Sequence, residues 1–253
     1  MKALYVAASG MAAQQTRIDN VANNIANVGT TGFKKSRESF QDLLYEELTQ
    51  GGKASSQARL EVGGGVQLAG IEKDHRQGSL TQTGQPLHAA IAGDAFFTLE
   101  TAEGEPVYTR DGTFRLDADG TLVTQSGLVV GGNITIPEDA QQVFITGDGT
   151  VQAVLQGSVD YTVLGQLELA SFTNPAGLRA LGGNLYEQTP ESGEVFVPRP
   201  ESVEVKQGYL ESSNVDVAEE LIQMIMAQRS YELNSKVVQA ADEAMSVAVN
   251  LKR

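Results

Sequence analysis

Hydrophobic residues recur at alternating steps of about four and three at both ends of the chain, and this repeat most limits how the chain can fold. Near the start the repeat runs from Leu4 to Ile25, and near the end a row spaced seven residues apart runs from Val217 to Met245. This spacing is typical of helices that pack along a seam as a coiled coil. The pattern predicts one long helix at each end, and each helix needs a partner.

The first helix is expected to stop shortly after Val28. No Gly or Pro interrupts the chain between Met11 and Val28, and Gly29 and Gly32 follow as helix-ending residues. Its seam contains one polar residue, a glutamine. The predicted contact positions of this helix are Leu4, Ala8, Met11, Gln15, Ile18, Ala22 and Ile25.

The second helix is predicted to run from about Val215 to near Leu251. Asp216 and Glu219 have the spacing of a capping box at its start, with Asn214 as an alternative cap. A helix of this length exceeds most globular helices, so its seam calls for a partner. The predicted contact positions are Val217, Leu221, Met224, Gln228, Tyr231, Val238 and Met245.

The first helix has almost no charge. Between Ala3 and Phe33 the only charged side chains are Arg17 and Asp19, and amides and small residues fill the rest. Such a helix is too polar for lipid and too uncharged for open water, which favours burial against other protein surfaces. Further expected contact residues are Asn23, Asn24, Asn27 and Phe33.

Two arrangements can bury these helices. One is a helical hairpin within a single chain, but that arrangement alone would leave a broad uncharged face exposed to solvent. The other is packing between chains, in which the ends are largely disordered in the free monomer and become ordered on assembly. Head-to-tail packing of this kind produces helical filaments when the rotation does not close a ring.

The middle of the chain carries signals for short strands and tight turns. Three Asp-Gly pairs, at 111–112, 119–120 and 148–149, are typical of hairpin turns, since Gly tolerates positive φ. Strands are predicted over 95–99, 113–116, 121–124, 142–145 and 166–170. Short strands spaced in this way indicate an all-β domain.

The expected fold is therefore mainly β with long α-helical termini. Residues 1–33 and 208–253 would form one discontinuous coiled-coil domain from both chain ends. Residues 66–207 would form an inserted all-β domain. Residues 34–65 would form an extended connector, in which 46–65 is polar, Gly-rich and without a clear period.

Charge and composition exclude several functions. The net charge of −14 argues against nucleic acid as a partner, because phosphate contacts need clustered Lys and Arg. The one basic cluster, Lys34, Lys35 and Arg37, is interpreted as a solvated loop, with an anionic partner as the alternative. No cysteine is present, which rules out disulfides and thiolate metal sites.

No residue pattern indicates catalysis, a cofactor or a metal. The two histidines, His75 and His88, lie thirteen apart in a Gly-rich region without matching carboxylates. Asp117 and Asp119 faintly resemble a calcium loop, but the distal Glu of that motif is missing and a hairpin turn explains them better. We therefore expect a protein that is not an enzyme.

The start of the chain lacks the features of a leader or a membrane span. Its apolar stretch is less dense than that of a signal peptide, so the N-terminus is expected to be retained. No apolar run approaches the ~20 residues of a membrane-spanning helix.

Distinct motifs stand in the three parts of the chain. They are residues 7–11 (AASGM), 23–28 (NNIANV), 30–34 (TTGFK), 91–97 (IAGDAFF), 108–114 (YTRDGTF), 208–211 (GYLE), 213–216 (SNVD) and 228–232 (QRSYE). Together these motifs resemble one family, the flagellar rod, hook and hook-associated proteins. The match covers essentially the whole chain, and the motifs stand in the family's order.

Within that family the chain is most similar to the subunits of the distal rod. The resemblance implies a non-catalytic subunit, exported unfolded by the flagellar type III apparatus without a cleaved signal peptide. It would assemble with copies of itself into a tubular drive shaft across the periplasm. Its implied neighbours are other rod proteins, the hook protein and the peptidoglycan-ring and outer-membrane-ring proteins. A proximal rod or hook-like axial protein, or a cell-wall carbohydrate-binding β module, are the alternatives.

Overall fold

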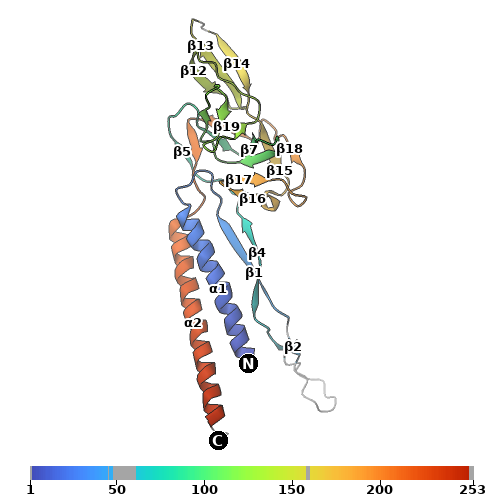
Figure 1. The fold of residues 1–253 in the computed structure, drawn as a ribbon, viewed down its shortest axis with the longest axis vertical. Coiled ribbons are helices and arrows are strands. Elements are labelled where there is room, and N and C mark those ends of the chain that lie inside the picture. Colours follow the sequence, from blue (N-terminus) through green and yellow to red (C-terminus); the bar gives the residue numbers. More distant parts are fainter. Residues whose placement is uncertain (1, 45, 48–60, 158–159, 251–253) are drawn as a thin grey trace. The chain divides into compact units, whose positions relative to one another are not determined.

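The computed structural model describes residues 2–44, 46–47, 61–157 and 160–250. Its contacts divide the chain into two compact units. Unit 1 comprises residues 1–26, 36–73 and 216–253, and unit 2 comprises residues 27–35 and 74–215. The expected fold class is confirmed, because a helix stands at each end of a β-rich chain (Figure 1).

Unit 1 is built around two helices, α1 (Lys2–Ala26) and α2 (Val217–Asn250), which run side by side (Figure 1). The predicted cap of the second helix is confirmed. Asp216 Oδ1 accepts the backbone N–H of Ala218 at 2.8 Å and of Glu219 at 3.2 Å. These bonds satisfy donors that the first helical turn leaves free. Neither helix, over its described residues, is long and apolar enough to cross a membrane.

One of the two rows of the predicted seam of α1 is shifted by one residue in the structure, whereas Leu4, Met11, Ile18 and Ile25 of the other row are half-buried. Ala7 and Val21 are buried, whereas Ala8 and Ala22 are exposed. The sequence alone cannot choose between these two pairs, because positions 7 and 8 both carry alanine and either can follow Leu4 at a helical step. The helices also approach closely, since a Cβ added to Gly10 would lie 2.8 Å from Asn234 Nδ2.

A two-stranded ribbon completes unit 1. Strands β1 (Ser36–Asp42) and β4 (Val66–Lys73) pair antiparallel, and both contact α1. A second short pair, β2 (Glu46–Glu47) and β3 (Glu61–Val62), follows. Residues 36–44 and 61–73, expected to be connector and the first β-domain strand, therefore belong with the helices. The remaining part of the predicted connector, 48–60, lies outside the described residues.

Unit 2 contains antiparallel sheets. The largest has the order β16-β17-β8-β7-β11-β10-β9, with β15 joined to β7 and β18 to β15. A three-stranded sheet β12-β13-β14 and the pairs β6–β19 and β5–β20 complete the unit. The strands are β5 (Leu80–Gln82), β6 (Ala89–Ala92), β7 (Phe96–Glu100), β8 (Pro106–Thr109), β9 (Arg115–Leu116), β10 (Leu122–Val123), β11 (Val129–Val130), β12 (Ala140–Ile145), β13 (Thr150–Leu155), β14 (Tyr161–Gln166), β15 (Leu169–Phe172), β16 (Arg179–Gly182), β17 (Leu185–Glu187), β18 (Val195–Phe196), β19 (Glu204–Gln207) and β20 (Tyr209–Glu211).

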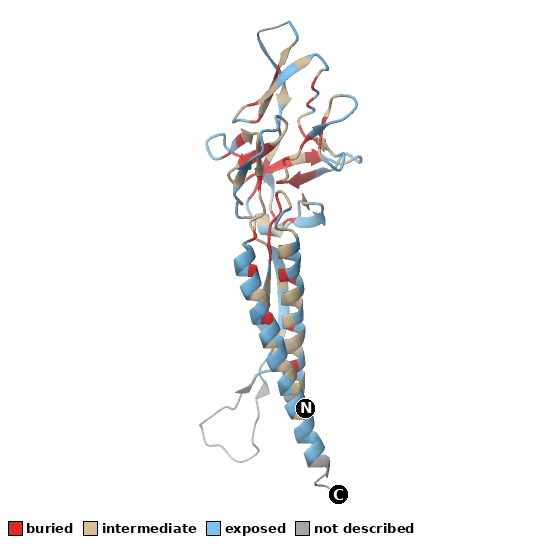
Figure 2. Ribbon diagram, turned by 90° about the vertical axis from the view of Figure 1, so that its left-hand side faces the viewer, coloured by how far each residue is buried: buried red, intermediate tan, exposed pale blue. Residues whose placement is uncertain are grey.

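The core of unit 2 lies on both faces of β7. Phe97 and Leu99 are fully buried in an aliphatic cluster, where the Phe97 ring meets Phe114 edge-on at 5.0 Å. Phe96 points into a second cluster, where it packs against Phe172 and Tyr186. Figure 2 shows this concentration of buried strands.

Two of the three Asp-Gly hairpins are confirmed. Gly120 (φ 77°) lies in the turn between β9 and β10, and Gly149 (φ 85°) lies in the turn between β12 and β13. The third prediction, at Asp111-Gly112, is wrong. Gly112 instead lies against Ala89, whose carbonyl oxygen would be 1.6 Å from a Cβ at that position. Glycine is needed there for close backbone approach rather than for a turn.

Candidate assembly surface

Unit 1 satisfies part of its polar interior without any partner. The side-chain amide of Asn24 donates to Ser36 O at 3.0 Å, and its Oδ1 accepts Ser36 N–H at 2.9 Å. It also donates to Glu220 Oε2 on α2 at 3.2 Å, and Asn20 adds another bond to Ser36 O. Asn24, predicted to contact another chain, is 1% exposed and is therefore used inside this one.

Charged groups at the helix pair are also matched within unit 1. Arg17 Nε lies 3.2 Å from Glu38 Oε1 on the ribbon, and its guanidinium also donates to Gln223 on α2. Ala227 of α2 is 1% exposed. The α1–α2 contact therefore combines small residues with specific polar pairs, which fix the register of two helices better than a uniformly apolar seam.

The outward side of α2 is different, because it leaves large apolar side chains in solvent. Their exposed fractions are 58% for Ile222, 51% for Ile225, 56% for Met226, 61% for Leu233 and 48% for Val237. Most of α2 is correspondingly exposed in Figure 2. These five residues are called the outer apolar face of α2. An exposed apolar row of this kind marks an interaction surface.

The predicted contact positions of α2 do not include the outer apolar face, because they follow another row of the helix. Ile225 and Met226 lie three and four residues after Ile222, and Leu233 and Val237 continue that side at steps of seven and four. Arg229 and Lys236 interrupt them and obscure the pattern. The usable signal was that α2 has apolar residues on two sides, which one partner helix cannot cover.

The basic cluster is not the solvated loop that was predicted. Lys34 is 0% exposed and Lys35 is 8% exposed, and only Arg37 is exposed as expected. Lys34 Nζ donates to Glu211 Oε1 at 2.5 Å and to Arg76 O at 2.8 Å within unit 2. Burial lowers the pKa of Lys34, and the nearby Glu211 carboxylate opposes that shift.

The histidines have packing and hydrogen-bond roles. The His75 ring meets Phe96 at 5.6 Å and Tyr186 at 5.1 Å, both edge-on. His88 Nδ1 shares a 2.9 Å hydrogen bond with Thr83 Oγ1. Among the described residues, no group of three or more His, Asp or Glu side chains could hold a metal ion.

Three family models match successive parts of the chain. Residues 4–34 match a flagella basal body rod protein model, residues 90–153 match a flagellar hook protein FlgE/F/G D1 domain model, and residues 206–251 match a flagellar basal body rod FlgEFG protein C-terminal model. The whole chain is also similar to the full length of the flagellar basal-body rod protein FlgG of Agrobacterium fabrum, at 48% identity. The chain belongs to the flagellar basal-body rod protein family.

Other rod proteins show the same full-length similarity. The FlgG protein of Bacillus subtilis is 39% identical over 100% of both chains. The rod protein FlgF of Caulobacter vibrioides is 34% identical over 98% of this chain and 96% of its own. The resemblance noted from the motifs is thereby confirmed, and this rod-family chain is a structural subunit of the flagellum.

The predicted contact residues of this rod-family chain fall into three classes. Leu4, Met11, Ile18, Ile25, Asn27, Met224 and Val238 are half-buried; Ala8, Gln15, Ala22, Asn23, Val217, Leu221, Gln228, Tyr231 and Met245 are exposed; Asn24 and Phe33 are buried. Phe33 is 7% exposed inside unit 2, so its surface is already covered within the chain. For the others, contact with a neighbouring chain stays a prediction.

Proposed function

We propose that this chain is a non-catalytic subunit of the distal rod, and that it polymerises with copies of itself into a tubular shaft that carries torque from motor to hook. The outer apolar face of α2 is the observation that carries the proposal. One side of α2 packs against α1, and the other side leaves Ile222, Ile225 and Leu233 exposed to solvent. Such a helix is suited to packing between subunits.

The distal position is favoured by the order of similarity among rod proteins. FlgG relatives range from 38% to 48% identity, whereas the FlgF relative is 34% identical. A proximal rod or hook-like position is the alternative within the same class. Similarity over the whole chain, helical ends included, argues against a carbohydrate-binding β module with incidental arms.

The proposal includes partners and a location. The chain would be exported through the flagellar type III apparatus without a cleaved signal peptide and would cross the periplasm as part of the rod. Other rod proteins and the hook protein would lie at the ends of its assembly. The peptidoglycan-ring and outer-membrane-ring proteins would surround it.

Electron microscopy of basal bodies from cells that lack this chain tests the proposal. Stunted rods without hooks are expected, and the full-length chain supplied in trans should restore both. Complete loss of the rod would indicate that the subunit belongs to the proximal rod instead. Normal rods and hooks would refute an axial role.

A matched pair of variants tests the surface that carries the proposal. Ile225→Asp places a charge in the outer apolar face of α2 and should prevent rod completion, because a buried unpaired charge is costly. Glu232→Asp keeps the charge at a neighbouring exposed position of α2 and should restore rods. Normal rods with Ile225→Asp would show that this face is not buried in the assembly.

A further inference from the structure

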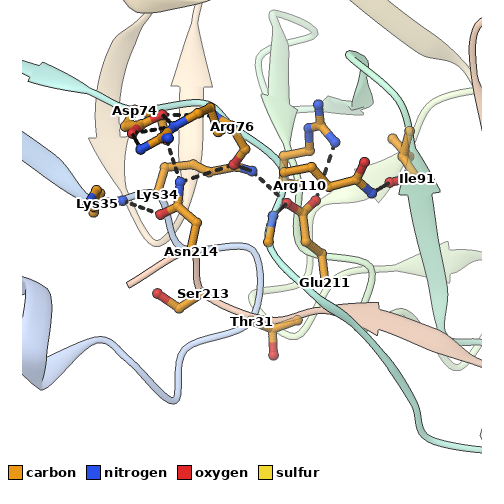
Figure 3. A network of polar contacts seen from close by, with 12 residues as sticks. Thr31, Lys34, Lys35, Asp74, Arg76, Ile91, Arg110, Glu211, Ser213 and Asn214 are labelled. Carbon is orange, nitrogen blue, oxygen red and sulfur yellow. Dashed lines mark hydrogen bonds and ion pairs between the residues drawn. The ribbon is translucent and has the colours of Figure 1, made fainter. Parts of the chain in front are cut away.

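The chain passes between its two units four times, at residues 26/27, 35/36, 73/74 and 215/216. On the side of unit 2, these crossings lead into three short segments. We define the four-segment junction as residues 31–35, 74–78 and 211–215 together with 110–112, all of which belong to unit 2. Figure 3 shows the polar contacts among them.

The Glu211 carboxylate lies at the centre of the four-segment junction. Its Oε1 accepts the Lys34 ammonium at 2.5 Å and the Gly78 N–H at 2.8 Å. Its Oε2 accepts Arg110 Nη1 at 3.3 Å. The side chains of Lys34, Arg110 and Glu211 are 0%, 2% and 1% exposed. One buried carboxylate therefore contacts three of the other segments.

Asn214 joins the same segments through a second set of bonds. Its Oδ1 accepts the Lys35 N–H at 2.8 Å, and its Nδ2 donates to Asp74 O at 2.8 Å and Arg76 O at 3.0 Å. Its backbone N–H donates to Phe33 O at 3.4 Å. Asp74 N–H in turn donates to Lys35 O at 2.9 Å. The unit 2 residues next to three of the crossings are thus hydrogen-bonded to one another.

Glycines let these segments touch backbone to backbone. A Cβ on Gly32 would lie 2.8 Å from the backbone of both Arg110 and Asp111, and a Cβ on Gly78 would lie 2.0 Å from Ser212 O. Contacts this close leave the segments little freedom to slide. The four-segment junction is therefore held together by close backbone packing as well as by hydrogen bonds.

Charge makes the four-segment junction depend on one residue. Burying ions is costly unless each is paired and hydrogen-bonded, and removing one partner of a buried pair is far more harmful than removing a surface ion pair. Loss of the Glu211 charge takes away the carboxylate that both Lys34 and Arg110 contact. The junction should open before the aromatic core of unit 2 does.

We propose that the four-segment junction is a mechanical clamp. It ties the unit 2 residues next to the crossings at 35/36, 73/74 and 215/216 into one block, so that force passing along the chain between the units is shared among these crossings instead of opening them one at a time. This role rests on the proposed function as a torque-carrying subunit. It assigns Glu211 as the residue that holds the clamp closed.

Amide hydrogen exchange on the purified full-length chain tests whether the clamp is a separate cooperative element. In Glu211→Gln, the amides of Gly32, Gly78 and Asn214 should exchange about 100-fold faster, while those of β7 and β8 change by less than about threefold. The control is Glu204→Gln, which makes the same change at a side chain that is 65% exposed. Unchanged junction amides in Glu211→Gln would overturn the proposal.

A milder variant covers the case in which Glu211→Gln unfolds unit 2 altogether. Lys34→Met removes one cation and leaves the Arg110–Glu211 pair intact, so the core should persist while the Gly32 amide exchanges faster. Cells carrying the variant that loosens the junction should build rods and hooks in normal number but stop swimming at lower viscosity than wild type. Equal swimming at every viscosity would overturn the clamp, whereas normal rods in cells lacking the chain would overturn the proposed function itself.

Discussion

Truncating two side chains of the outer apolar face of α2 should raise the concentration needed for polymerisation. Ile222→Ala and Ile225→Ala each remove three carbons, worth about 2.4 kcal/mol if fully transferred from solvent to protein, at ~0.8 kcal/mol per carbon. Because Ile222 and Ile225 are 58% and 51% exposed in the single chain, about half of that, ~1.2 kcal/mol each, is still to be gained by contact with a neighbour. The double variant should therefore lose about 2.4 kcal/mol per subunit added, roughly a 50-fold rise in critical concentration.

The folded subunit itself should be unaffected by this change. Alanine is the best helix former, and both isoleucines are more than half exposed in the single chain. The assay is the concentration of chain left in the supernatant after polymers are pelleted, with circular dichroism as the check on folding. Val163→Ala, at a residue that is 61% exposed on β14 in unit 2, is the matched control. An unchanged critical concentration for the double variant, or an equal rise for the control, would refute the assignment of the face.

Three further predictions concern stability, each measured by urea unfolding of the purified chain. Asn24→Ala should lower the free energy of unfolding of unit 1 by about 2 kcal/mol, because it leaves the buried backbone N–H and C=O of Ser36 without their side-chain partner. Gln228→Ala, which removes an exposed amide of α2, should leave this free energy unchanged; equal effects of the two variants would contradict the in-chain role of Asn24. Burial raises the pKa of Tyr186 from 10.0 to about 12, so the unfolded chain loses this proton first and the free energy of unfolding should fall by ~2 kcal/mol as the pH rises from 10 to 12. Tyr186→Phe should flatten that dependence, and an unaltered slope would show that another group titrates. Phe97→Ala should lower the free energy of unfolding of unit 2 by about 4 kcal/mol. A loss below ~2 kcal/mol would mean that neighbouring side chains move to fill the cavity left by the ring.

The ends of the fold could be predicted because their signals are local. The hydrophobic rows and the Asp216 cap predicted both helices, and the bounds of α2, Val217–Asn250, differ from the predicted ones by only one or two residues. The exact face could not be predicted. Positions 7 and 8 both carry alanine, so the sequence fits either companion row, and the ribbon of residues 36–42 and 66–73 that also contacts α1 is not visible in the local pattern.

The buried charges could not be predicted from their neighbours in sequence. Lys34 and Lys35 look like a surface cluster until Glu211 is brought beside Lys34, and that residue lies 177 positions away. Likewise, Asp111-Gly112 has the composition of a hairpin turn, but its glycine is required by Ala89, which approaches from β6. Long-range contacts decide both cases, and residue composition carries no trace of them.

The two terminal helices differ from the sequence-based expectation in which of them offers groups for contact between chains. The amides of α1 were expected to be the groups that recognise other chains, yet Asn24 is consumed by Ser36 and Glu220 within unit 1. The apolar residues of α2 that no in-chain partner covers are then the stronger candidates for contact between subunits. Directional polar bonds fix one in-chain register, whereas apolar contacts tolerate small shifts because they have no fixed direction. Unit 1, whose helices are held in register by polar bonds and whose α2 presents an apolar face, is therefore suited to repeated contacts between subunits that leave its own fold unchanged.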